Sequence, residues 1–371
     1  MTYRFDPELA AVVPMLLTLD FANLAVVREL LAEARRGQHH DTTGVDVRVV
    51  RVPGPPDAPE VPVRVYRPAP AHTAGPTGAT AGLLHIQGGG FVIGDRGVEG
   101  ACLALVRALN LVIVSVDYRL APEHPFPAAL EDCYAALEWL ASNATDLGVD
   151  PTRIAVRGTS AGAGLAAGLA LLTRDRGGPP LCFQFLGVPE LDDRLDTPSM
   201  RRFVDTPMLD RSTAVISWNA YLGEGVPGTQ DVSPYAAPAR ATDLTGLPPA
   251  YISVMEFDPL RDEGLAYAQA LLAARVPVEL HLFAGTFHGS GGVAAPAAVS
   301  RREHGEATTV LAAALGLSPE PPTDRTTAGR RVVGPRPGPG DDRMTPPVAG
   351  RDHIQDDNTG QKLLVRPNRP G

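Results

Sequence analysis

Several features that would restrict the class of protein are scarce in this 371-residue sequence. Its three cysteines, Cys102, Cys133 and Cys182, are widely spaced and form no metal-binding motif, so we expect them to be reduced and in the core. No run is long and apolar enough to span a membrane, and the first residues lack the basic and apolar regions of a signal peptide. We therefore expect a cytoplasmic protein without integral membrane association.

The sequence has fewer basic than acidic residues, 33 against 42. The formal net charge is −9, and Lys362 is the only lysine, which argues against a nucleic-acid partner. Hydrophobic residues make up 44% of the sequence and charged residues 20%, as is typical of a soluble globular enzyme. The length allows one large α/β domain or two small ones.

The order of apolar patterns predicts the organisation of the chain. Residues 1–44 form an N-terminal helical segment, because leucine and valine recur at helical spacing over residues 7–37. Two strands, Val45–Val52 and Val61–Tyr66, follow, and the small residues of 72–82 form a loop. Residues 45–317 make up the core.

From Leu83 onward, apolar strands alternate with helices, which predicts a mostly parallel sheet with helices on both faces. The two antiparallel strands before it should form an edge. The expected strands are Leu83–Gln87, Leu111–Asp117, Ile154–Val156, Cys182–Leu186, Ala250–Glu256 and Val278–Phe283, with helices that include Ala128–Ala141 and Ala163–Arg174.

Two stretches interrupt this rhythm. The insertion at residues 190–228 carries aromatic residues and helical spacing, so we expect it to cover the active site as a cap; the alternative is a surface excursion. Residues 318–371 are dense in proline and glycine and lack aromatics. Such a segment cannot bury enough apolar surface to offset its ordering entropy, so we expect a disordered tail without a catalytic part.

The pentapeptide Gly158-Thr159-Ser160-Ala161-Gly162 lies between an apolar strand and a run of helix formers. A G-x-S-x-G turn between a strand and a helix is typical of a nucleophile elbow, in which the serine has strained backbone geometry. The start of the helix favours developing negative charge. We predict that Ser160 is a nucleophile, against the alternative of a plain glycine-rich turn.

A serine nucleophile needs a base and an acid, which should follow it in the order acid, then histidine. His288 follows the last expected strand in a loop of small residues, whereas His281 lies inside that strand and His304 in a polar helical stretch. Asp258 comes directly after the strand at 250–256 and can hold the imidazole and stabilise its charged form. Its rivals are Asp262 and Glu256.

The oxyanion hole should come from two places. One donor is the backbone N–H of Ala161, next to the nucleophile. The others are Gly88 and Gly89, which follow a strand and lack side chains that would block their N–H groups. Gly90 mainly shapes this loop and could take over a donor role, and Gln87 supports the loop.

These motifs, together with Val116-Asp117-Tyr118-Arg119-Leu120-Ala121-Pro122-Glu123-His124, resemble those of the hormone-sensitive-lipase family of bacterial esterases over residues 5–316. The resemblance implies an α/β-hydrolase fold with a helical cap from the N-terminal segment, residues 1–44, and the insertion at 190–228. It implies, in addition, cofactor-free, metal-free hydrolysis of small carboxylic esters, usually with short acyl chains. It also implies that the Tyr118–His124 stretch scaffolds the site. A homodimer is left open.

The sequence departs from the family pattern at two positions. Gln87 stands where the family's glycine loop usually begins with histidine, and Thr159 replaces the acidic residue usual before the nucleophile. These changes bear on rate, pH response and substrate choice. Two alternatives to an esterase remain: an amidase or lactonase with the same triad, and a non-catalytic ligand-binding protein on the same fold.

Overall fold

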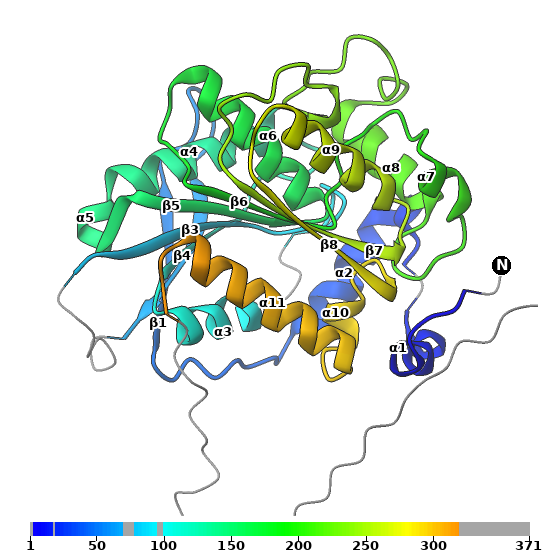
Figure 1. The fold of residues 1–371 in the computed structure, drawn as a ribbon, viewed down its shortest axis with the longest axis horizontal. Coiled ribbons are helices and arrows are strands. Elements are labelled where there is room, and N and C mark those ends of the chain that lie inside the picture. Colours follow the sequence, from blue (N-terminus) through cyan, green and yellow to red (C-terminus); the bar gives the residue numbers. More distant parts are fainter. Residues whose placement is uncertain (1–2, 18, 70–77, 95–98, 319–371) are drawn as a thin grey trace, which may run out of the picture. The chain divides into compact units, whose positions relative to one another are not determined.

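The computed structural model describes residues 3–17, 19–69, 78–94 and 99–318 (Figure 1). These residues contain an eight-stranded sheet in the order β1-β2-β4-β3-β5-β6-β7-β8. The strands are β1 (Val45–Val52), β2 (Val61–Pro68), β3 (Thr80–Ile86), β4 (Val112–Val116), β5 (Val149–Thr159), β6 (Phe183–Gly187), β7 (Ala250–Phe257) and β8 (Val278–Phe287).

The directions of the strands confirm the predicted sheet. β1 pairs antiparallel with β2 and β2 antiparallel with β4, so the two early strands form an edge. All other neighbours pair in parallel. The carboxyl ends of six strands therefore meet at one edge of the sheet, where the loops of an open α/β sheet form its binding crevice.

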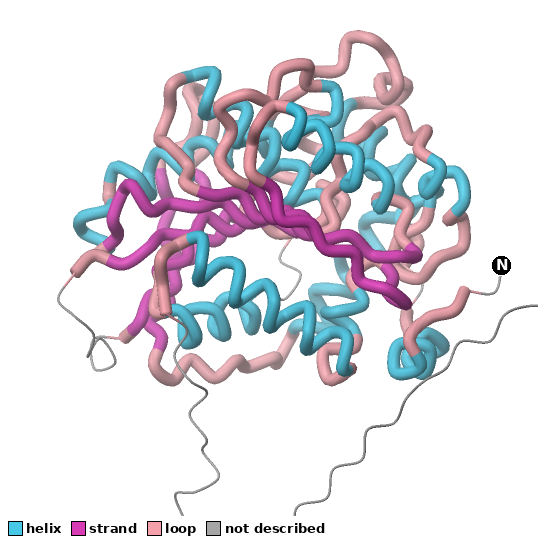
Figure 2. Tube along the Cα trace, viewed as in Figure 1, coloured by secondary structure: helices cyan, strands magenta, loops and turns pink. Residues whose placement is uncertain are grey.

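Helices cover both faces of the sheet (Figures 1 and 2). α4 (Ala128–Ser142), α6 (Ala161–Arg176) and α9 (Arg261–Ala273) lie on one face, and α3 (Glu99–Leu109) and α11 (Ala298–Ala314) lie on the other. Two short helices are α5 (Ala144–Leu147) and α10 (Ser290–Val293).

Strands β1 to β7 each contribute to two apolar cores, because successive side chains point to opposite faces. Val114 and Val156 pack in the core on the α6 side, whereas Ile113 and Ala155 pack in the core with α3. The apolar runs that predicted buried parallel strands therefore fill both layers.

The expected single helix over residues 7–37 is wrong in detail. The segment breaks into α1 (Pro7–Val12), two short 3-10 turns and α2 (Leu24–Arg35). Pro14 lies in the first of these turns, and Leu16 after it has extended backbone. The two helices also pack in different places, since Leu9 joins a cluster with residues of β8 while Val27 joins the main core.

The insertion at residues 190–228 contains α7 (Pro198–Arg202) and α8 (Arg211–Leu222). Trp218 and Tyr221 of α8 are fully buried, and the Tyr221 ring stacks on Phe91 with centroids 3.9 Å apart. α8 is therefore packed onto the loop that follows β3. Its action as a cap over the substrate stays a prediction.

Three smaller expectations have mixed outcomes. The loop expected at 72–82 is wrong at its end, because Thr80 already begins β3 and pairs with β5; its start lies outside the described residues. The cysteines are free, but only Cys102 and Cys133 are buried, and Cys182 is half-buried. Almost all of the expected disordered tail, residues 319–371, lies outside the described residues.

Candidate active site

Ser160 lies in the sharp turn between β5 and α6. Its φ of 57° and ψ of −128° fall in a region that residues with side chains rarely adopt, as expected for a nucleophile elbow. A Cβ at Gly158 would lie 2.1 Å from the carbonyl oxygen of Gly162, and one at Gly162 would lie 2.3 Å from that of Ile86. The turn therefore needs glycine at both ends because backbone occupies the space of a side chain.

The structure brings Ser160, His288 and Asp258 into one chain of hydrogen bonds. His288 Nε2 lies 2.9 Å from Ser160 Oγ, and His288 Nδ1 lies 2.8 Å from Asp258 Oδ2. All three residues are buried. β8 extends beyond its expected end to Phe287, so that His288 follows the strand directly.

Asp258 is held by its own turn, since its other carboxylate oxygen accepts a hydrogen bond from the N–H of Leu260 at 2.9 Å. The rival acids have other partners. Asp262, in the first turn of α9, accepts the N–H of Ser199 at 2.7 Å, and Glu256 accepts the N–H of Gly285 at 2.7 Å. Glu256 thus anchors the segment just before His288.

The competing histidines lie apart from the serine hydroxyl. His281 Nδ1 is 2.9 Å from a carboxylate oxygen of Glu306, and His304 lies on α11 at the wall of the pocket described below. Only His288 is hydrogen-bonded to Ser160 among the described histidines.

The loop after β3 lies beside the serine. Gly88 and Gly89 line the same pocket as Ser160. A Cβ at Gly90, by contrast, would meet Ser217 Oγ of α8 at 3.1 Å. Ala161 is the first residue of α6, where backbone N–H groups have no acceptor within the helix. That the N–H groups of Gly88, Gly89 and Ala161 together stabilise an oxyanion stays a prediction.

The side chain of Gln87 does not line the pocket of Ser160. It is buried and lines a separate hollow with residues of β2 and β4. Its carbonyl oxygen accepts the hydroxyl of Tyr118 at 3.0 Å, which ties the start of the glycine loop to the Tyr118–His124 stretch. Thr159, by contrast, does line the pocket of Ser160.

The sequence reasoning missed Glu190, the first residue of the insertion. It is 1% exposed, its N–H donates to the carbonyl oxygen of Ser160 at 3.3 Å, and its Oε1 accepts the hydroxyl of Ser217 at 2.9 Å. Burial raises the pKa of Glu190 to about 7, although the Ser217 hydrogen bond and the His288 ring oppose this shift. The only signal was an acidic residue soon after an apolar strand, separated from Gly187 by Val188 and Pro189.

The reasoning also missed Arg157, which lies in the strand that leads to the elbow. It lines a pocket of about 450 Å³ that also includes Ser160 and His288. A volume of this order is typical of sites for small molecules. The signal was a charged residue directly after the expected strand Ile154–Val156.

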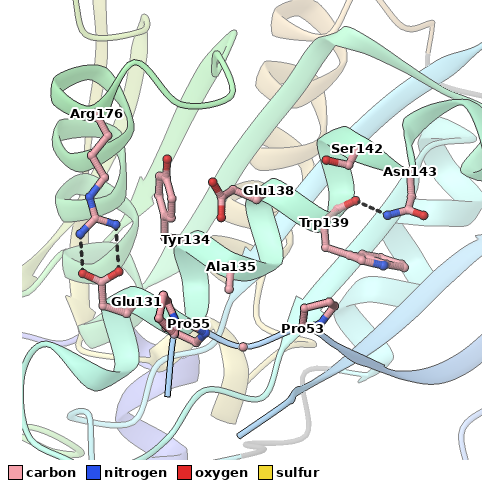
Figure 3. A pocket seen from close by; sticks show the side chains of 12 residues that line it. Pro53, Pro55, Glu131, Tyr134, Ala135, Glu138, Trp139, Ser142, Asn143 and Arg176 are labelled. Carbon is pink, nitrogen blue, oxygen red and sulfur yellow. Dashed lines mark hydrogen bonds and ion pairs between the residues drawn. The ribbon is translucent and has the colours of Figure 1, made fainter. Parts of the chain in front are cut away.

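A second pocket of about 380 Å³ lies between α4 and the turn that joins β1 and β2 (Figure 3). Its polar side chains include Arg176 and Glu131, which form an ion pair at 2.6 Å. It contains none of the residues that surround Ser160, so we place the candidate chemistry in the first pocket.

The described residues contain no group of three or more histidine, cysteine or acidic side chains that could hold a metal ion. None of their helices combines the length and the apolar character needed to cross a membrane.

Comparisons with known proteins show the family of the chain. Residues 83–291 match the model of a family with the alpha/beta hydrolase fold. The chain is 39% identical over 308 residues to the esterase LipI of Mycobacterium tuberculosis, covering 81% of this chain and 92% of that protein. It is 44% identical over 228 residues to the carboxylesterase NlhH of the same species, covering 60% and 68% respectively.

Among solved structures, a bacterial heroin esterase is similar with a TM-score of 0.79 and 51% identity, covering 84% of this chain and 98% of that one. An esterase from Pyrobaculum calidifontis has a TM-score of 0.71 and 33% identity, covering 83% and 98%. The predicted fold is confirmed. The chain belongs to the hormone-sensitive-lipase family of carboxylesterases, which has the α/β-hydrolase fold.

Proposed function

We propose that this protein hydrolyses small carboxylic esters with short acyl chains through a Ser160–His288–Asp258 triad. The observation that carries the proposal is the continuous hydrogen-bonded chain from the Asp258 carboxylate through both nitrogens of His288 to the Ser160 hydroxyl. In such a chain the carboxylate holds the tautomer whose Nε2 can accept the serine proton. The names of the similar esterases support the choice of an ester as substrate.

Hydrolysis proceeds in two halves. Ser160 Oγ attacks the ester carbonyl while His288 Nε2 takes the hydroxyl proton, and the N–H groups of Gly88, Gly89 and Ala161 stabilise the oxyanion. His288 then donates this proton to the leaving alcohol as the carbon–oxygen bond breaks. Water attacks the acyl-enzyme by the same proton path, which releases the acid and restores the serine.

The proposal is tested with Ser160→Ala on p-nitrophenyl butyrate, with thermal unfolding as the check on folding. We expect turnover to vanish while the folded state persists, because the variant loses the nucleophile and only one hydroxyl group. Ser212→Ala changes an exposed serine of α8 and serves as the matched control, which should keep the activity of the wild type. Retained turnover in Ser160→Ala would overturn the assignment.

The substrate class is tested with p-nitrophenyl esters of increasing acyl length, each assayed beside the matched amide. We expect esters to be cleaved faster than amides, since p-nitrophenolate is a better leaving group than the p-nitroanilide anion. Faster turnover of the amides would instead favour an amidase.

A further inference from the structure

The pocket beside Ser160 extends along the sheet, away from the catalytic serine. Its floor includes a row of four side chains that the strand register places side by side: His85, Arg157, Phe185 and Tyr251. Residues from α3 and α11 form the opposite wall. Because Arg157 lies on β5 three residues before Ser160, the row lies roughly 10 Å from the nucleophile at about 3.3 Å per residue.

Arg157 brings a positive charge into this pocket without a carboxylate partner among the described residues. Its Nη1 lies 3.0 Å from Nδ1 of His85, and its guanidinium carbon lies 5.4 Å from the centre of the Phe185 ring. Its Nε is buried and has no hydrogen-bond partner. Burial lowers the pKa of Arg157, but a guanidinium stays protonated in proteins.

Two other partly buried arginines have an acidic partner at ion-pair distance. Arg240 lies 2.5 Å from a carboxylate oxygen of Asp193, and Arg119 lies 2.7 Å from one of Asp132. A guanidinium that is removed from water without such a partner is costly. Within the described part of the chain, Arg157 therefore lacks the carboxylate at ion-pair distance that Asp193 and Asp132 supply to those two arginines, and the charge of Glu303 acts on it only from farther away.

Two glutamates of α11 lie near this end of the pocket. Glu303 lines the pocket but is not within ion-pair distance of Arg157. Its carboxyl group faces Gly291 instead, because a Cβ added to that glycine would lie 2.4 Å from Glu303 Oε2. Burial raises the pKa of Glu303 to about 7. Near neutral pH the protonated part of Glu303 can donate a hydrogen bond to an anion. Glu306 already contacts His281 and the hydroxyl of Tyr251.

We propose that this pocket holds the acyl part of the substrate and that Arg157 binds a carboxylate at its far end. The preferred substrates are then half-esters of dicarboxylic acids. The acyl part stays bonded to Ser160, whereas the alcohol must leave and water must enter from solvent. A pocket that runs from Ser160 along the sheet therefore suits the acyl part. The rings of Phe185 and Tyr251, which stack on each other with centroids 4.6 Å apart and are almost fully buried, lie beside Arg157 in this floor. The inference rests on the proposed ester hydrolysis.

The test compares p-nitrophenyl monoesters of adipic, pimelic and suberic acid with the same acyl chains ending in a neutral amide. We expect the wild type to have the higher kcat/KM for the acids, and Arg157→Met to lower the acid-to-amide ratio about tenfold to a hundredfold, the range for a charged hydrogen bond. Arg157→Lys should restore part of this ratio. Glu303→Gln should raise the ratio, because it removes the nearby negative charge.

Arg51→Met removes an exposed arginine of β1 and is the matched control, for which the ratio should not change. Equal loss on acids and amides in Arg157→Met would show a structural role and overturn the inference. So would a wild type that hydrolyses the amide-ended esters but does not prefer the acids, an outcome that leaves the proposed esterase activity intact.

Binding of monomethyl adipate to the Ser160→Ala variant, measured by calorimetry, tests the same contact without turnover. We expect binding that Arg157→Met weakens about tenfold or more in the same background. Binding that is independent of Arg157 would refute the contact even if the esterase activity itself proved wrong.

Discussion

Gly162 offers the sharpest test of how the nucleophile elbow is built. A methyl group at this position would lie 2.3 Å from the carbonyl oxygen of Ile86 and 2.4 Å from that of Gln87. Both oxygens belong to backbone, at the end of β3 and the start of the glycine loop. The two distances from the added methyl group to these oxygens are about 1 Å shorter than the 3.4 Å at which ordinary van der Waals contact begins. In Gly162→Ala, α6 and this loop must therefore separate by about that distance.

The separation would act on catalysis because Ala161 lies on α6 and Gly88 lies on the loop. Donors on the two sides would no longer converge on one oxyanion. A misplacement of 1 Å costs about a hundredfold, and loss of one oxyanion donor costs about a hundredfold to a thousandfold in kcat. We expect kcat to fall by about two orders of magnitude, and overpacking to lower the free energy of unfolding by about 1–3 kcal/mol.

The assay is steady-state hydrolysis of p-nitrophenyl butyrate together with urea-induced unfolding. Gly305→Ala is the matched control, because Gly305 lies inside α11 with no heavy atom within 4 Å of its added Cβ. We expect this control to keep full activity and to gain up to about 1 kcal/mol from helix propensity. A kcat for Gly162→Ala within twofold of the wild type would refute the reasoning that backbone contact holds the donors in place.

Two further predictions concern buried acids. Asp258→Asn should lower kcat by about four orders of magnitude because the amide favours the wrong His288 tautomer, whereas Asp262→Asn, one turn away, should lower it little; comparable losses would remove Asp258 from its role. Burial raises the pKa of Glu190 from 4.5 to about 7, so ionisation of this carboxyl opposes folding. As the pH rises from about 4.5 to 7, the free energy of unfolding of the wild type should fall relative to that of Glu190→Gln by up to about 3 kcal/mol. Urea unfolding at pH 5 and pH 8 measures this, and an equal difference at both pH values would contradict it.

Local sequence carried most of the information about the triad. The elbow requires glycine at both ends of a short segment, and the acid and base each follow a strand directly, so strand patterns placed Ser160, Asp258 and His288 at one edge of the sheet. The exact ends of elements were less accessible. β5 and β8 are longer than the apolar pattern indicated, because strand pairing continues through polar and glycine residues that carry no periodic signal.

The N-terminal segment shows the opposite case, in which local pattern misled. Its leucines and valines repeat at helical spacing, yet the segment breaks near Pro14 and its two helices bury their apolar residues in different clusters. Periodicity records which residues are apolar along the chain. It does not record that two halves of one pattern contact different parts of the core.

The sequence by itself determined the fold class, the order of the catalytic candidates and the family, since each depends on short motifs with their own local geometry. Only the tertiary structure decided what surrounds Ser160. Arg157 lines its pocket without a carboxylate at ion-pair distance among the described residues, and Glu190 lies buried against Ser160. The Gln87 side chain lines a separate hollow. The reason is physical. Alternation along a strand says which side chains share a face, but their neighbours depend on which strands pair and in what register, and on loops that return from far along the chain.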